Sequence, residues 1–445
     1  MTLTRQLARY AVESRFEALP QAVQHEAARA FLNWVGVTLG GSAEDASRIA
    51  ARFVASEGAT PVSSVIGHGF RTSIASAAFV NCIASSVLAY DDAHLPTVAH
   101  PSGPAAAAVF ALAQARAVSG AEFLNALALG IEVQCRVANM LSLPPAPMNP
   151  KFYVNGFSGP IGVAAAVGRL IRLDEQQMRW AIGTAASQAS GFRAAHGTMN
   201  SHFRPGSSTR AGVVAALMAE MGFDCIENAL EVDGGFIDVY APGSDPEMAL
   251  AGLGEHHEML ANRYKAYPCG IVVPPTIDAC REIRARIPAG AAIARVELAV
   301  NPLVLTLTGK REPRTTIEAG ISVYHWAAAA LLCDQLGLDT PEAACVADPA
   351  IAELRGRIEA EARPDLGKGE AMAKVTLADG TVLESHVIHA RGSLERPLTD
   401  GELNTKFADL ARVRLGHDAA EALREMCWQV GDLADVGGEI GVLLP

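Results

Sequence analysis

Three segments rich in Ala and Gly constrain the fold of this chain of 445 residues more than any other feature. They are PAAAAVFALAQARA at 104–117, GAEFLNALALGIEVQCRVANML at 120–141 and IGVAAAVGRLIRL at 161–173. Ala favours the helical conformation, and small side chains let neighbouring helices approach closely. Aromatic residues make up only 6% of the chain, which suits packed helices better than a β-sandwich. We therefore expect these segments to form the middle of a helical bundle.

The pattern changes after about residue 264. The segment RVELAVNPLVLTLTG at 295–309 alternates with the period of a strand, and AKVTLADGTVLESHVI at 373–388 predicts two strands joined through Asp379 and Gly380. The intervening segment 344–362 has a helical pattern, and helix returns after residue 400. These patterns predict a smaller α+β domain at 268–390, inserted between helical parts at 1–267 and 391–445.

Charge and composition limit the partners and the compartment. The net charge of −12 and the pI near 5.5 argue against nucleic acid or an acidic membrane surface as partner. The first sixteen residues are charged and amphipathic, unlike a signal peptide, and no apolar run is long enough to span a membrane. The eight cysteines show no metal-binding spacing. We expect a soluble cytoplasmic protein with reduced cysteines.

The stretch AYDDAHLPTVAHPSGP at 89–104 is the first candidate for chemistry. It places Asp91, Asp92, His94 and His100 in a segment that prolines keep from being a regular helix, so a loop must aim these side chains. Ser102 is a suitable N-cap for the Ala-rich helix that follows, and a helix start of this kind favours an anion. The alternative is that the carboxylates and imidazoles only stabilise a turn.

Two further helix starts resemble this one. Ser158 follows a loop that carries Lys151, Tyr153 and Asn155, and Ser208 follows the most basic stretch of the chain. That stretch is the best candidate for a carboxylate-binding wall; its basic residues are Arg193, His196, His202, Arg204 and Arg210. Alternatively, the similar helix starts only cap their own helices and face no common ligand. The basic stretch could likewise be a solvated basic face.

Six segments in order resemble the MmgE/PrpD family, which includes dehydratases, decarboxylases and an epimerase. They are YDDAHLPTVAHPSGP, GFSGPIGVAAAVGRLIRLD, RPGSSTRAGVVAALMAEMGF, KAYPC with TIDA, the helix around Tyr324, and RPLTDGELNTKF. The resemblance implies a mainly α fold, in which a large all-helical domain built from both chain ends carries a smaller inserted α+β lid domain. It also implies a homodimer and no required metal or organic cofactor.

The resemblance further implies an active site that moves protons next to substrate carboxylates. Three residues match family positions: His100 before PSG, Lys265 in KAYPC, and Tyr324. Five other positions depart from the family's usual residues. They are Ala93, Tyr153, Asn155, Ser201 and Gly270, where the family typically has Thr, His, Thr, Lys and His, in that order.

A mechanism for such a site needs a base close to the α-proton and cations on the carboxylate. His100 has a suitable ordinary pKa, whereas Tyr153 could act as a base only if cations lowered its pKa from about 10. The catalytic candidates are His100, Tyr153, Tyr324, Asp91 and Asp92. The substrate-binding candidates are Lys265, His94, Asn155, Ser201, His202, Arg204, Arg210 and Arg193.

We therefore expect a cofactor-independent lyase of the dehydratase or decarboxylase type that acts on a small di- or tricarboxylate. An epimerase of a dicarboxylate is the second reading, because the departures from the family's residues fall on positions typical of the known lyases. A carboxylate-binding homologue without catalysis is the third. A metal site formed by His94, His100 and Asp91 is the weakest, because no helical i, i+4 pair of ligands is present.

Overall fold

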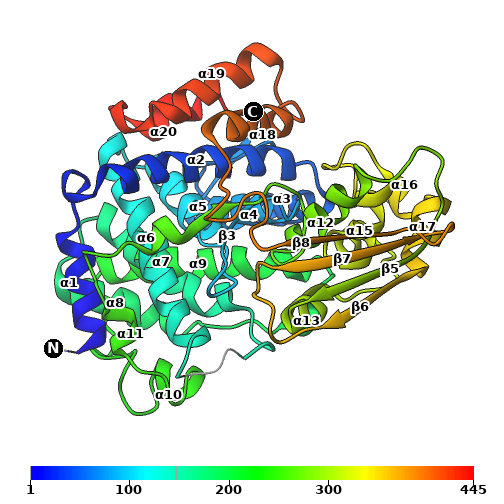
Figure 1. Cartoon of the computed structure of the whole chain (residues 1–445). Coiled ribbons are helices and arrows are strands. Elements are labelled where there is room, and N and C mark those ends of the chain that lie inside the picture. The colour runs from blue at the N-terminus through cyan, green and yellow to red at the C-terminus, as the bar shows by residue number, and fades with distance from the viewer. Residues whose placement is uncertain (1, 146–148) are drawn as a thin grey trace. The chain divides into compact units, whose positions relative to one another are not determined.

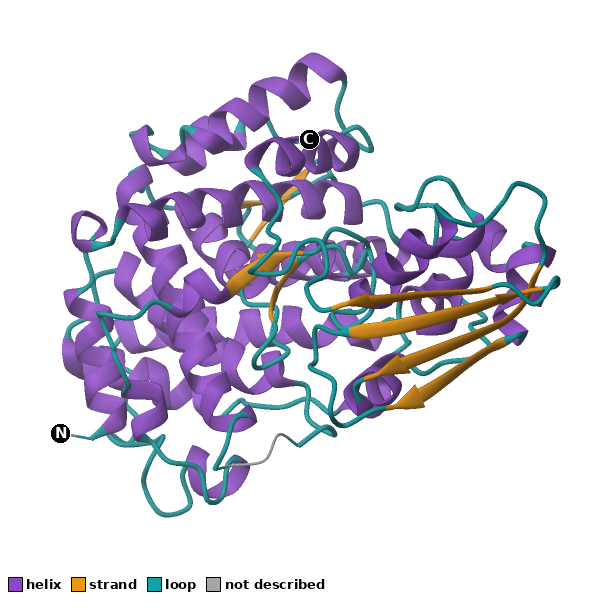
Figure 2. Ribbon diagram, in the orientation of Figure 1, coloured by secondary structure: helices purple, strands orange, loops and turns teal. Residues whose placement is uncertain are grey.

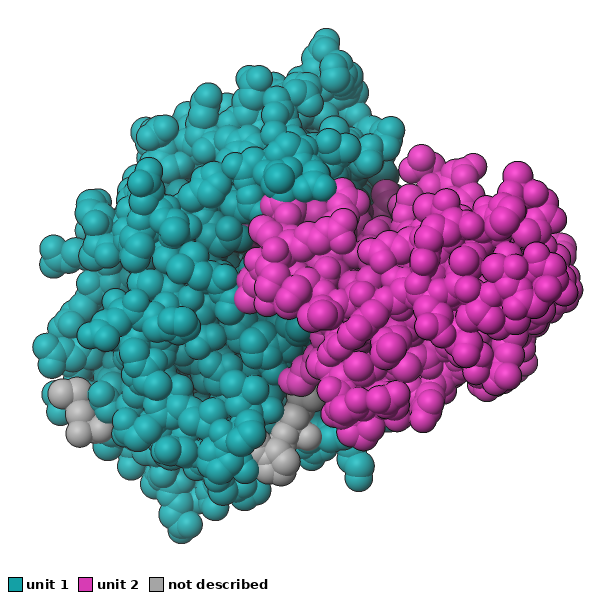
Figure 3. All heavy atoms as spheres, viewed as in Figure 1, with its two compact units in different colours: residues 1–87, 91–262, 399–445 teal, residues 88–90, 263–398 magenta. Residues whose placement is uncertain are grey.

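A computed structural model describes residues 2–145 and 149–445. The chain divides into two compact units (Figure 3). Unit 1 contains residues 1–87, 91–262 and 399–445, and unit 2 contains residues 88–90 and 263–398. The sequence places the domain boundaries at 267/268 and 390/391, and those boundaries stay a prediction.

Unit 1 is built mainly from helices (Figures 1 and 2). Its C-terminal helices α18 and α19 pack against α2, so the end of the chain returns to its beginning. The α-helices are α1 (Leu3–Glu13), α2 (Gln21–Gly41), α3 (Asp45–Ser56), α4 (Ile74–Ser86), α5 (Ser102–Ala113), α6 (Gly120–Ser142), α7 (Val154–Leu170), α8 (Glu175–Ala186), α9 (Asn200–Glu220), α10 (Phe236–Tyr240), α11 (Glu247–Leu250), α18 (Asp400–Ala411), α19 (His417–Trp428) and α20 (Val436–Gly441). The 3-10 helices are η1 (Phe16–Ala18), η2 (Arg193–Ala195), η3 (Glu258–Ala261) and η4 (Val430–Asp432).

The small-residue helices α6 and α7 pack closely, as the sequence predicts. A methyl group on Gly162 of α7 would lie 2.5 Å from the carbonyl oxygen of Gly130 in α6, which leaves no room for a side chain. Helix α7 also packs against α9, and α9 packs against α4. This packing brings the loop before α7 and the start of α9 into one region of unit 1.

We expect Gly162→Ala to lower the free energy of unfolding by about 1–3 kcal/mol, because the added methyl group overpacks the contact between α6 and α7. Urea unfolding would measure the change. Gly356→Ala is the matched control, because a Cβ at Gly356 meets nothing within 4 Å. Equal stability of the two variants would contradict the close packing.

Unit 2 combines a four-stranded sheet with helices. The strand order is β6-β5-β7-β8; β5 and β6 are parallel, and the other neighbouring pairs are antiparallel. Helix α12 packs against β7 and β8, and α15 packs against α12 and α17. The elements are α12 (Pro274–Arg284), β5 (Ile293–Val300), α13 (Pro302–Thr308), α14 (Thr316–Gly320), α15 (Val323–Leu332), α16 (Ala343–Val346), α17 (Pro349–Gly356), β6 (Ile358–Ala362), β7 (Ala371–Leu377) and β8 (Val382–Val387).

The hairpin predicted at Asp379 and Gly380 is confirmed: β7 and β8 pair there, and Gly380 has a φ of 88°. Two other assignments are wrong. The strand pattern at 295–309 continues only to Val300, because Pro302 begins helix α13. The helical pattern at 344–362 ends at Gly356, and the last five residues form strand β6 beside β5.

The expected fold class also needs correction. Unit 1 is not all-helical, because it contains the antiparallel strands β1 (Ser63–Val65) and β2 (Phe70–Thr72) and the short strand β3 (Asp92–His94). Strand β4 (Asn262–Tyr264) lies where the chain passes into unit 2. Unit 2 has its own sheet and helices, and nothing in its described residues marks it as a lid.

None of the helices in the described residues is long and apolar enough to cross a bilayer.

Candidate active site

The turn between His94 and His100 is the centre of the candidate site. The His94 N–H donates to the Ala99 carbonyl oxygen at 2.8 Å, and the Ala99 N–H donates back at 3.3 Å. Between them Val98 has a φ of 59°. A β-branched residue rarely adopts this left-handed conformation, which costs of the order of 1–3 kcal/mol. The surrounding structure therefore has to hold this turn in place.

His100 is held with a defined ring orientation. Its Nδ1 lies 2.7 Å from the carbonyl oxygen of Asp92 and 3.4 Å from the carboxylate of Asp91. Both oxygens only accept, so Nδ1 carries the hydrogen of the neutral ring and the lone pair is on Nε2. The Asn155 amide accepts from the His100 N–H at 2.9 Å and donates to its carbonyl oxygen at 2.8 Å. Asn155 thus holds the His100 backbone, and its role in substrate binding stays a prediction.

Asp92 provides the anion that the first helix start was expected to attract. Its Oδ2 accepts from the backbone N–H of Ser102 at 3.0 Å and from the Ser102 hydroxyl at 2.6 Å. Helix α5 begins at Ser102 itself, so Ser102 is not the N-cap. Burial raises the pKa of Asp92, and the neighbouring Asp91 carboxylate raises it further. The structure thus gives Asp92 a capping role.

His94 is fully buried, and both of its ring nitrogens have protein partners. Nδ1 lies 2.8 Å from the Thr97 hydroxyl, and Nε2 lies 3.1 Å from the carboxylate of Glu258. The sequence predicts that His94 binds a substrate, but both of its ring nitrogens are already engaged by these protein partners. The Glu258 partner lies 164 residues away, and no spacing in the sequence indicates it.

The other two predicted helix starts are wrong. Helix α7 begins at Val154 and contains Pro160, and α9 begins at Asn200 and contains Pro205. Pro160 cannot donate to the carbonyl four residues earlier, and that Gly156 carbonyl accepts instead from the Ser190 N–H at 3.0 Å. Segment 151–156 is thereby hydrogen-bonded to segment 190–193. Ser158 lies inside α7 and Ser208 lies inside α9.

This connection brings Tyr153 against Arg204. The Arg204 guanidinium lies 4.0 Å above the centre of the Tyr153 ring, and Arg204 is only 7% exposed. Burial lowers the pKa of Arg204. Burial also raises the pKa of Tyr153, although Arg204 opposes the change. The condition for Tyr153 to act as a base is therefore not met, and the protonated phenol is a hydrogen-bond donor.

The remaining polar candidates of unit 1 bind other protein groups. Arg193 donates to the carbonyl oxygens of Pro150 and Phe152, at 2.7 and 3.2 Å. The Ser201 hydroxyl donates to the Ala195 carbonyl oxygen at 3.2 Å, and His202 Nδ1 lies 3.2 Å from the Ser86 hydroxyl. Arg210 is 3.4 Å from Glu57, with 39% of its side chain exposed, so it forms a surface ion pair.

The pKa of His196 is lowered in part by the positive charges around it. Its pKa is lowered to about 3, first by burial and then by the charges of Arg193, Arg204, His202 and His100. The basic residues therefore lie close enough to act on one another, unlike a dispersed solvated face. An anion is the natural counterpart of such a group.

We expect this lowered pKa to make the protein less stable in acid. The unfolded chain takes up a proton near pH 6.5, whereas folded His196 does so only near pH 3. The unfolding free energy therefore falls as the pH decreases from about 6.5 towards 3. In His196→Gln this dependence should be weaker, as measured by urea unfolding at several pH values. Identical pH dependences would contradict the assignment.

Unit 2 carries the other two family-matched residues. Lys265 is buried, and its Nζ donates to the Ala89 carbonyl oxygen at 3.2 Å. Tyr324 on α15 is buried, and the Arg311 guanidinium lies 4.7 Å from its ring centre. Burial raises the pKa of Cys269 to about 12, which makes its thiol a poor nucleophile at neutral pH.

In residues 2–145 and 149–445, no three or more His, Cys, Asp or Glu side chains gather in an arrangement that could hold a metal ion.

Comparison with known proteins identifies the family. The MmgE/PrpD N-terminal domain model matches residues 5–249, and the C-terminal domain model matches residues 267–431. The chain is 27% identical to a cis-aconitate decarboxylase of Homo sapiens over 375 residues, which cover 81% of this chain and 77% of the human protein. It is 24% identical to a cis-aconitate decarboxylase-like protein of Aspergillus oryzae over 464 residues, which cover 98% and 95% of the two chains. The two domain models together span most of the sequence, and this chain therefore belongs to the MmgE/PrpD family.

Proposed function

We propose that this chain is an acid–base lyase that acts on a small di- or tricarboxylate, with Arg204 binding one carboxylate and His100 moving the proton. The observation that carries the proposal is the unsatisfied edge of the Arg204 guanidinium. The site described in unit 1 supplies both residues, and the chemistry needs no cofactor.

One edge of Arg204 is available for a ligand. Nη1 donates to the Phe192 carbonyl oxygen at 2.8 Å, whereas Nε and Nη2 have no hydrogen-bond partner among the described residues. The Nε and Nη2 N–H groups form one edge of the planar guanidinium. This edge can bind both oxygens of a carboxylate. A buried charge without a partner is costly, so a carboxylate here would satisfy the edge and neutralise the charge.

His100 has the features of a proton-transfer group. Its lone pair on Nε2 can accept a proton from a carbon next to a carboxylate, and its ordinary pKa lies near neutrality. The Asp91 carboxylate, 3.4 Å from Nδ1, would stabilise the imidazolium that forms. Tyr153 would remain protonated and could donate a hydrogen bond to the substrate.

The relatives support a carboxy-lyase reaction on cis-aconitate as the first possibility to test, because their names describe cis-aconitate decarboxylases. In this reaction the bond between carbon and one carboxylate breaks and carbon dioxide leaves. The electron pair stays on the remaining carbon skeleton, which then receives a proton from a protonated site group. In a hydro-lyase reaction, His100 would take the α-proton and hydroxide would leave as water after protonation.

The roles that the family resemblance implies for Lys265 in substrate binding and for Tyr324 in catalysis stay predictions. The homodimer is likewise a prediction from the family resemblance.

Proton NMR of the purified protein in D₂O tests the proposed function with cis-aconitate, citrate, 2-methylcitrate and iminodisuccinate as substrates. Loss of carbon dioxide or water from one of them, with deuterium in the product, is the expected result. Deuterium entering an unchanged skeleton would replace the lyase with an epimerase. Absence of turnover, together with absence of binding in calorimetry, would contradict a carboxylate site at Arg204.

A further inference from the structure

We propose that Glu258 and Asn262 are positioning residues that hold the His100 turn in its working geometry, Glu258 through His94 and Asn262 through Asp92. The inference rests on the proposed role of His100 as the proton-transfer group. It concerns one short segment, residues 258–262, which includes η3 and belongs to unit 1.

The first anchor is the buried contact between His94 and Glu258. His94 is 0% exposed, and its Nε2 lies 3.1 Å from the Glu258 carboxylate. The other ring nitrogen meets the Thr97 hydroxyl at 2.8 Å. Because His94 begins the turn that ends at His100, its side chain fixes the near end of that turn. A carboxylate that orients a histidine through its ring N–H is a common way to fix the ring.

Glu258 is itself held by a network that reaches into α6. Its second carboxylate oxygen accepts from the Asn139 amide at 3.0 Å. Arg136 pairs with Glu132 at 2.6 Å and donates to the His256 carbonyl oxygen at 2.6 Å, which fixes the chain just before Glu258. The charges that face Glu258 are His94, Arg136 and Glu132. Burial raises the pKa of Glu258, but the hydrogen bond and charge of His94, the charge of Arg136 and the Asn139 hydrogen bond outweigh burial and keep this pKa below its usual value.

The second anchor comes four residues later. The Asn262 amide donates to Asp92 Oδ2 at 2.7 Å and lies 3.3 Å from the Ser102 hydroxyl. The backbone carbonyl of the same Asp92 receives the His100 Nδ1–H at 2.7 Å. Asn262 thus fixes the residue that sets the orientation of the His100 ring.

Both anchors are needed because the turn that they hold, from His94 to His100, is strained. Val98, with its φ of 59°, would relax towards a common conformation if the turn were released. A displacement of about 1 Å in a catalytic group can reduce the rate by about 10²-fold. Loss of either anchor should therefore affect the proton-transfer step more than the binding of the carboxylate at Arg204.

The first test uses Glu258→Gln in the full-length protein. Both Glu258 oxygens accept hydrogen bonds, from His94 and from Asn139, and an amide of the same size can satisfy only one of them in this way. We expect kcat to fall by about 10–100-fold while KM changes less than about threefold. Asn262→Leu removes the amide hydrogen bonds to Asp92 and Ser102 and should lower kcat by about tenfold.

Glu231→Gln is the matched control. Glu231 also accepts two hydrogen bonds, from the backbone N–H and the hydroxyl of Thr4 at 3.1 and 2.5 Å, but these contacts fix α1. It should keep the wild-type kcat. Loss of kcat in all three variants in proportion to their loss of folded protein would overturn the proposal, because the anchors would then have only a structural role.

A second measurement does not depend on turnover. In the wild type, ¹⁵N NMR of labelled histidines should show His100 with hydrogen on Nδ1, and His100→Asn identifies the signal. In Glu258→Gln and Asn262→Leu the two ring nitrogens should approach an average, whereas Glu231→Gln should leave them unchanged. Unchanged His100 signals in both anchor variants would overturn the inference. Wild-type protein without turnover would overturn only the proposed function, and the spectra would still decide the positioning.

Discussion

Replacing His100 with Asn is expected to reduce kcat by about 10²–10⁴-fold, the range that one general acid–base group contributes. Asn can still accept a hydrogen bond, but it cannot take up a proton near neutral pH. KM should change little, because Arg204 and its contacts are untouched. Steady-state kinetics with the substrate identified by NMR would measure both constants.

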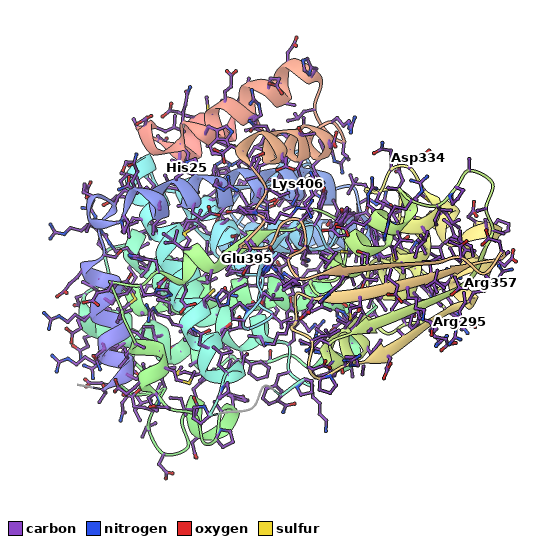
Figure 4. The ribbon with its side chains drawn as sticks, in the orientation of Figure 1. His25, Arg295, Asp334, Arg357, Glu395 and Lys406 are labelled. Carbon is purple, nitrogen blue, oxygen red and sulfur yellow. The ribbon has the colours of Figure 1, made fainter. Side chains whose placement is uncertain are left out.

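His25→Asn is the matched control for this variant. His25 lies on α2, is labelled in Figure 4, and pairs with Asp400 of α18 at 3.2 Å. It should retain wild-type kcat. A His100→Asn protein with wild-type kcat and wild-type folding would show that another group moves the proton.

Replacing Arg204 with Met is expected to weaken the enzyme and to stabilise the unliganded protein. Truncating one partner of a buried charge pair costs about 2–5 kcal/mol of binding, so kcat/KM should fall by roughly 30- to 5000-fold, mainly through KM. The free protein should gain stability, because Met removes a buried guanidinium whose Nε and Nη2 have no partner in the described structure. Kinetics and thermal unfolding without ligand measure the two effects.

Two variants separate charge from geometry. Arg204→Lys keeps the charge but loses the two-point edge, so its KM should lie between those of the wild type and Arg204→Met. Arg210→Met, on the same helix, removes only a surface ion pair with Glu57 and should change KM less than about twofold. Arg204→Met with wild-type KM and lowered stability would show that Arg204 serves only to hold the Phe192 carbonyl and the Tyr153 ring.

The sequence predicted those parts of the site that depend on neighbours in the chain. Asp91, Asp92 and His100 fall within ten residues, and the structure brings them into contact. The basic stretch around Arg204 was also visible as a cluster. Its members have different partners, however, because Arg193 holds backbone carbonyls and Arg210 lies at the surface.

Residues 258–262 show where sequence reasoning fails. Glu258 and Asn262 meet His94 and Asp92 across more than 160 residues, and both lie in an ordinary polar segment, HHEMLANRY. The same limit explains the errors in the fold. The segment RIEAEA does not indicate a strand by itself, and it forms one because β5 provides a pairing partner. Pro160 suggests a helix start, but the helix continues through it because the distant Ser190 N–H satisfies the Gly156 carbonyl.

The sequence by itself determined the small-residue helices, the hairpin at Gly380, the grouping of Asp91, Asp92 and His100, and the family, because these depend on side-chain size, on local backbone preference and on the order of motifs. Only the tertiary structure decided which polar groups are already satisfied and which are not. His94 and Asn155 are occupied by protein partners, while one edge of Arg204 is left without one in the described residues. Hydrogen-bond partners of buried groups come from distant segments, so their assignment requires the folded chain.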